Sequence, residues 1–90
     1  MDAAELIKQY KGGMKDFSGI ELTGAALDNT DLAQVVFSQA ILTEANFTRA
    51  NLVNADFYFA RLDLSNLSEA TLTEANLKST TLRSALLYKV

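Results

Sequence analysis

The chain is 90 residues long, 49% of them apolar, and its eight basic and eleven acidic residues give a formal net charge of −3. This length fits one small domain, and the acidic balance argues against direct nucleic-acid binding, which uses basic surfaces. Cysteine and histidine are absent, which excludes disulfides and thiol nucleophiles and removes the commonest general base and metal ligand.

Residues 1–13 are predicted to form an N-terminal capping helix followed by a Gly-Gly turn. Asp2 and Glu5 have the spacing of an acidic capping box, and apolar residues recur at positions 3, 6, 7 and 10, which is helical periodicity. Two lysines come late in the segment, where they suit the helix dipole, and two glycines follow. We expect a helix from Asp2 to Lys11 that covers one end of the domain behind it.

The same segment has none of the charged, apolar and cleavage regions of a secretory signal. No run in the chain approaches the ~18 continuous apolar residues of a membrane span. The sequence therefore predicts a cytoplasmic protein without membrane contact.

Residues 14–90 repeat a five-residue pattern, and we number each repeat from its central residue. All fifteen central positions hold Leu or Phe, at Phe17, Leu22, Leu27, Leu32, Phe37, Leu42, Phe47, Leu52, Phe57, Leu62, Leu67, Leu72, Leu77, Leu82 and Leu87. The position two residues earlier (−2) is Ala in nine repeats, and the position just before the centre (−1) is Asp or Asn in seven. The positions after the centre, +1 and +2, are mostly polar.

Neither a helix nor a continuous strand accommodates a period of five. A helix would turn the apolar residue a further ~140° round its axis at every repeat, and an odd period along a strand alternates between two faces. A chain that turns a corner at every repeat does accommodate it, because each short segment can then point its Leu or Phe and its Ala inward. Such turns stack at about 4.8 Å, so we expect a solenoid with an interior column of Leu, Phe and Ala.

The pattern A-[DN]-[LF]-[ST]-x, read in ANFTR, ANLVN and ADFYF, resembles the pentapeptide-repeat family over Lys15 to Lys89. The N-terminal segment is similar to that of short cyanobacterial members, most of them without an assigned role. The resemblance implies an all-β solenoid, a right-handed quadrilateral β-helix with four repeats per coil, in just under four coils. Residues 20 apart would then lie above one another, so Phe17, Phe37 and Phe57 should stack.

The C-terminal end of the repeats has no amphipathic helix to cover it. The segment SALLYKV stays in register to Leu87 and leaves apolar side chains at the coil end, at Leu86, Leu87, Tyr88 and Val90. A second copy in a homodimer, a missing continuation of the repeats and stacking confined to a crystal would each cover this end.

The charged residues predict surface ion pairs rather than a catalytic or metal site. With residues 20 apart in one column, Arg49 lies beside Glu69 and Lys89, and Asp63 lies below Arg83. The serines and threonines have no base beside them, and a Leu-filled solenoid has no internal cleft. We expect no enzyme activity, no cofactor and no metal.

Five large apolar residues interrupt positions that are otherwise polar, at Val36, Ile41, Tyr58, Phe59 and Leu64. In the four-sided arrangement they lie on two neighbouring faces of the second and third coils. They form either a contact surface or scattered exposed hydrophobic residues of the ordinary kind.

Two functions are compatible with these features. The first is a non-catalytic interaction or scaffolding module that binds an unidentified protein partner. The second follows from the resemblance, since some family members mimic B-DNA and bind DNA gyrase, which they protect from quinolones. That function requires a continuously negative face, whereas residues 15–90 carry nine acidic and six basic residues that are interleaved.

Overall fold

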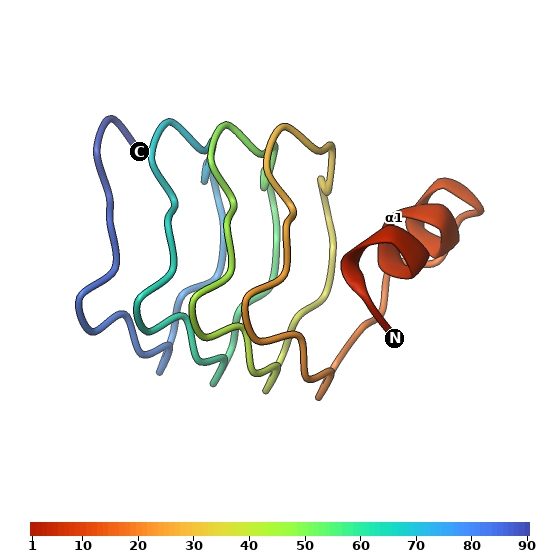
Figure 1. Ribbon diagram of the computed structural model, residues 1–90, viewed down its shortest axis with the longest axis horizontal. Helices are drawn as coiled ribbons and strands as arrows, with labels where there is room; N and C mark the ends of the chain where they lie inside the picture. The colour runs from red at the N-terminus through yellow and green to blue at the C-terminus, as the bar shows by residue number, and fades with distance from the viewer.

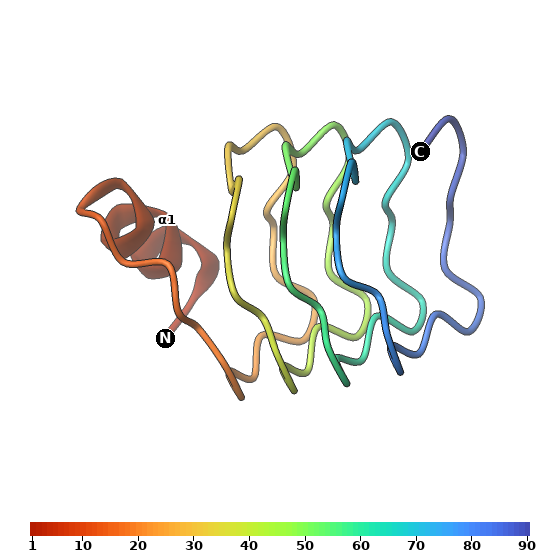
Figure 2. The same ribbon diagram turned by 180° about the vertical axis from the view of Figure 1, so that it is seen from behind.

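From residue 15 onward the chain is wound into stacked coils of 20 residues. The computed structural model describes residues 1–90, and eleven parallel bridges in it each join residues 20 apart, from Asp16–Val36 to Asn66–Leu86. Figures 1 and 2 show the coils in line, from the helix at one end to the blue C-terminal coil at the other. We refer to residues 15–34, 35–54, 55–74 and 75–90 as coils 1 to 4. Each complete coil therefore holds four repeats.

Each repeat forms one corner of a coil through a tight hydrogen-bonded turn. The carbonyl of the central residue accepts a bond from the N–H three residues later at every corner but one, as from Ala45 to Leu42 at 3.0 Å. At the exception, the hydroxyl of Thr30 donates to the carbonyl of Leu27 at 2.5 Å. The residue at +2 has a positive φ at every corner, as in type II turns. Thirteen of these residues are not glycine and have φ between 53° and 66°.

The Asp and Asn residues at the −1 position complete the corners. All seven accept a hydrogen bond from the backbone N–H two residues later, with distances of 3.0 to 3.2 Å. That N–H has no backbone acceptor in any of these repeats. Asp and Asn have the short oxygen-bearing side chain that such a turn needs, which explains their frequency at this position.

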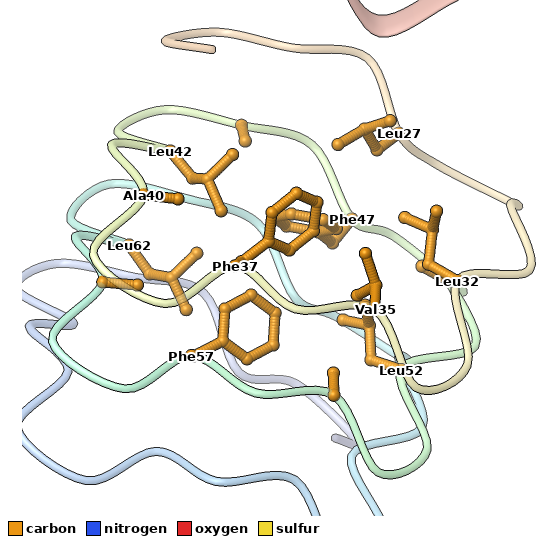
Figure 3. Close-up of a cluster of buried hydrophobic side chains, with 14 of the residues drawn as sticks. Leu27, Leu32, Val35, Phe37, Ala40, Leu42, Phe47, Leu52, Phe57 and Leu62 are labelled. Atoms are coloured by element: carbon orange, nitrogen blue, oxygen red, sulfur yellow. The ribbon is translucent and has the colours of Figure 1, made fainter. Parts of the chain in front are cut away.

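The core is a column of central residues that fills the inside of the coils (Figure 3). The ring centroids of Phe17 and Phe37 are 6.2 Å apart and those of Phe37 and Phe57 are 5.7 Å apart, so the predicted stack is confirmed. Phe47 enters from the opposite face and meets the rings of Phe37 and Phe57 edge-on, at 6.2 and 6.1 Å. The alanines of coils 2 and 3 are buried beside these residues, as predicted for a narrow interior.

The helix α1, Ala3–Lys11, covers the open end of coil 1 (Figure 1). Its N-cap is Asp2, whose carboxylate accepts from the Glu5 N–H at 2.9 Å, as the sequence indicates. Leu6 is fully buried in the core, and the Tyr10 hydroxyl donates to the Ala33 carbonyl at 2.7 Å. Neither the length of α1 nor its composition would let it cross a membrane.

Candidate functional site

Four of the five predicted patch residues are exposed around one face of the coils. We name each face by its first central residue, so the Leu22 face carries Leu22, Leu42, Leu62 and Leu82. Tyr58 and Phe59 occupy the corner that leads from the Phe17 face onto the Leu22 face in coil 3. Their rings meet edge-on at 4.6 Å, and the residues are 37% and 52% exposed.

Leu64 occupies the next corner of coil 3, on the other side of the Leu22 face, and is 56% exposed. Ile41 lies on the face itself in coil 2, bridged to Glu21 on one side and Arg61 on the other. Val36 contributes less than the sequence suggests, because it is half-buried between Asp16 and Asp56 on the Phe17 face. The apolar surface is therefore centred on the Leu22 face.

Three cations surround these apolar residues, which the sequence reasoning did not recognise. Arg61 lies on the Leu22 face between the two corners. Two backbone hydrogen bonds place the other two residues beside the patch in coil 4: the Phe59 N–H donates to the Lys78 carbonyl at 3.1 Å, and the Leu64 N–H donates to the Arg83 carbonyl at 2.8 Å. None of the three cations forms a salt bridge, since the only one in the structure is elsewhere.

Asp56 and Asp63, two carboxylates close to these cations, are bound to polar groups of the coils, whereas Glu44 lies beside Leu64 in coil 2. Asp56 accepts from the Tyr58 N–H at 3.0 Å and from the amide of Asn76 at 3.2 Å. Asp63 accepts from the backbone N–H of Arg83 at 2.8 Å and from the Thr81 hydroxyl at 3.2 Å. The expectation that Asp63 and Arg83 form a side-chain ion pair is therefore wrong, because Asp63 completes the corner of the following coil instead.

The other predicted ion-pair column is confirmed in part. Arg49 and Glu69 form a salt bridge of 3.4 Å on the surface, and Arg49 also donates to the side-chain oxygen of Asn29 at 3.0 Å. Lys89 follows Glu69 in this column as expected but forms no salt bridge with it, and its ammonium lies 5.3 Å from the ring centroid of Tyr88. Surface pairs of this kind contribute about 0–1 kcal/mol, so the column adds little to stability.

The carboxylates form neither a metal-binding group nor a continuous negative face. No three of them lie close enough to hold a metal ion. No column places two carboxylates in consecutive coils, since Val36 separates Asp16 from Asp56 and Arg49 precedes Glu69. The molecule extends 31 Å along its longest axis. The feature that DNA mimicry requires is not observed.

The C-terminal coil end is exposed as the sequence predicts. Leu86, Leu87, Tyr88 and Val90 are 58%, 45%, 65% and 50% exposed. Backbone N–H groups of coil 4 that would donate to a further coil, such as those of Leu77 and Leu82, have no backbone acceptor. Which molecule or segment covers this coil end stays a prediction.

Comparisons with known proteins agree with the repeat geometry. The family model for pentapeptide repeats, in 8 copies, matches residues 20–57 and 50–87. No curated protein matches the chain. Among solved structures, a pentapeptide repeat protein (Rfr23) from the cyanobacterium Cyanothece 51142 is 31% identical, with a TM-score of 0.49. That match covers 80% of this chain, which spans 59% of the length of Rfr23.

Two further solved structures come from the cyanobacterium Nostoc PCC 7120. The pentapeptide repeat protein alr5209 is 33% identical, with coverage of 90% of this chain and 75% of that one and a TM-score of 0.41. HetL, a pentapeptide repeat protein involved in heterocyst differentiation regulation, is 28% identical with a TM-score of 0.53. The match covers 94% of this chain and 46% of HetL.

Proposed function

The chain belongs to the pentapeptide-repeat family, and from this premise we propose that it is a non-catalytic protein-interaction module. Its scaffold would be the right-handed quadrilateral β-helix that the family implies, as residues 14–90, with residues 1–13 as the cap. Family and fold do not specify a partner. The proposal therefore rests on the positions at which this chain holds a residue that differs from its repeat pattern.

The observation that carries the proposal is the choice of residue at two adjacent corners. The +2 position requires a positive φ, and it holds Gly or a polar residue at thirteen of its fifteen occurrences. The exceptions are Phe59 and Leu64, with φ of 57° and 61°. Bulky residues are disfavoured in this region of backbone space, and their side chains are largely exposed. Their presence is explained if the side chains serve a contact.

The backbone around these corners is suited to presenting a fixed surface. The backbone N–H groups of Phe59 and Leu64 are bonded to coil 4. The next backbone N–H groups along the chain also form hydrogen bonds, which close the corner turns. Ala60 donates to the Phe57 carbonyl at 2.9 Å and Ser65 donates to the Leu62 carbonyl at 3.1 Å. A surface held in this way loses little conformational entropy on binding, which favours affinity.

Cross-linking at matched positions tests the proposal. A photoreactive benzoylphenylalanine replaces Tyr58 in one variant and Thr73 in the other, since both occupy the +1 position of coil 3 on different corners. In extracts of the source organism, we expect a discrete adduct from position 58 that unlabelled wild-type protein competes away. Adducts of equal yield from position 73, or none from position 58, would contradict the proposed surface.

We also propose that the C-terminal coil end contacts a second copy of the chain. Exposed apolar side chains and unpaired backbone donors occur together there, a combination that association would relieve. Light scattering over a range of concentrations tests this, with Leu86→Glu as the variant expected to remain monomeric. Wild-type protein that is monomeric throughout would exclude this contact.

A further inference from the structure

We infer that the surface around the Leu22 face is a docking strip for an acidic peptide segment that also carries apolar side chains. This inference rests on the proposed interaction function and specifies its partner. The strip consists of six residues of coils 3 and 4, which are Tyr58, Phe59, Arg61, Leu64, Lys78 and Arg83.

The backbone places an apolar residue next to a cationic one on both sides of one face. The ladder hydrogen bonds hold Lys78 beside Phe59 at one corner and Arg83 beside Leu64 at the other. Arg61 lies between these two corners. A segment that crosses the face would meet an apolar anchor and a cation at each edge and a third cation in the middle.

The charges of the strip favour an anionic partner. Arg61, Lys78 and Arg83 have no carboxylate within salt-bridge distance. Asp56 and Asp63, which lie near them, direct their oxygens to backbone and side-chain donors of the coils. Asp56 and Asp63 keep their negative charge while they accept these bonds, so they offset part of the charge of the three cations, which nevertheless stay free to pair with carboxylates of a partner. Complementary charge of this kind contributes mainly to specificity and to the association rate.

The apolar residues favour a peptide over a nucleic acid. Tyr58 and Phe59 offer rings at one corner, but Leu64 at the other corner is 56% exposed and aliphatic, which suits an apolar side chain rather than a base. An aromatic and an aliphatic anchor beside cations match a segment that alternates acidic and apolar side chains.

The contact would be made through side chains rather than by strand addition. The backbone N–H groups of Phe59 and Leu64 are bonded to coil 4, and those of Arg61 and Leu62 are bonded to coils 2 and 4. Four backbone N–H groups of this part of coil 3 are therefore already paired with neighbouring coils. A partner does not extend a sheet edge here, so its affinity depends on the anchors.

Selection from a displayed library of random peptides about twelve residues long, a length that can cross the face, tests the inference. Three variants use residues that the chain itself holds at equivalent positions, so the fold should persist. Phe59→Asn with Leu64→Asn copies Asn54, which has φ of 59°. Arg61→Thr, Lys78→Ser and Arg83→Thr are combined in a second variant. Val53→Thr with Lys89→Gln, away from the strip, is the control. Circular dichroism and thermal melting verify folding.

We expect the selected peptides to be net negative and to carry at least one aromatic or branched aliphatic residue. For the most enriched peptide, the dissociation constant should rise at least about tenfold in each strip variant and change less than about twofold in the control. Raising the salt from about 50 to about 500 mM should weaken binding several-fold.

Three results would overturn the inference. The first is selection of peptides that are neutral or basic, or of peptides that bind the Asn double variant as tightly as wild type. Either finding would place peptide recognition outside the strip and leave the proposed interaction function intact. Tighter binding of a single-stranded oligonucleotide than of any peptide would assign the strip to nucleic acid. Recovery of no peptide from the folded protein, together with no adduct from position 58, would remove both the strip and the proposed function.

Discussion

Truncation of Phe37 should destabilise this protein far more than truncation of a residue in the same column at the open end. The Phe37 ring is fully buried and lies within 6.2 Å of the rings of Phe17, Phe47 and Phe57, between centroids. Phe37→Ala would leave a cavity that rigid coils on both sides cannot close. Such a substitution costs about 3–5 kcal/mol, a large part of the total of about 5–13 kcal/mol expected for 90 residues.

Leu77 provides the comparison, because it ends the same column in coil 4 and is 36% exposed. Leu77→Ala removes three carbon groups, and burying each of them contributes about 0.8 kcal/mol. Because Leu77 is only about two thirds buried, roughly two thirds of that free energy is lost. The expected cost is therefore about 1.5 kcal/mol, and no enclosed cavity forms because one side of Leu77 is open.

Urea denaturation followed by far-ultraviolet circular dichroism measures both costs. With a slope near 2 kcal/mol per M, the midpoint should fall by about 2 M for Phe37→Ala and by less than about 1 M for Leu77→Ala. An unchanged slope would show that both variants unfold as wild type does. Equal losses in the two variants would refute the idea that the central rings of coils 1 to 3 dominate stability.

Further predictions concern polar groups. Ser65 is fully buried and its hydroxyl has no hydrogen-bond partner, so Ser65→Ala should raise the free energy of unfolding by about 1 kcal/mol; a loss would reveal an internal water bound there. Asn66→Ala leaves the Ser68 N–H without its acceptor at 3.0 Å and should cost about 1 kcal/mol, whereas Asn66→Asp should be nearly neutral in the same titration. Hydrogen bonds from Ser18, first from its hydroxyl and then from its N–H, lower the pKa of Asp16 below its ordinary 3.8, and Thr23 likewise lowers the pKa of Glu21 below 4.5. Their contribution to stability is thus complete above these values and is lost as the pH falls through the lowered pKa. The double variant Asp16→Asn and Glu21→Gln should lose less stability between about pH 5 and pH 2 than wild type, and an unchanged pH profile would contradict this.

Several features of the fold could be predicted from residue spacing because they depend on local sterics. An apolar residue every fifth position is buried only if the chain turns at each repeat, so the inward direction of Leu42 or Phe57 follows from spacing alone. The N-cap at Asp2 is equally local, since the bond to the Glu5 N–H spans three residues. The family relation added the count of four repeats per coil, which spacing does not determine.

The charged and apolar surface required the tertiary structure. The sequence placed Asp63 below Arg83, yet only the folded structure shows that the carboxylate accepts the backbone N–H of Arg83 and leaves the guanidinium without a salt bridge. The role of Asp and Asn at −1 was likewise visible as a preference but had no reason until the corner N–H groups were located.

By itself, the amino-acid sequence determined which side chains face inward, because a strict period of five admits one way of hiding Leu and Phe from water. The coil length of 20 residues and the juxtaposition of Phe59 with Lys78 and of Leu64 with Arg83 were decided by tertiary structure. Both features result from backbone hydrogen bonds that join residues separated by 19 or by 21 positions in the sequence. No local pattern encodes which distant residues these bonds bring together.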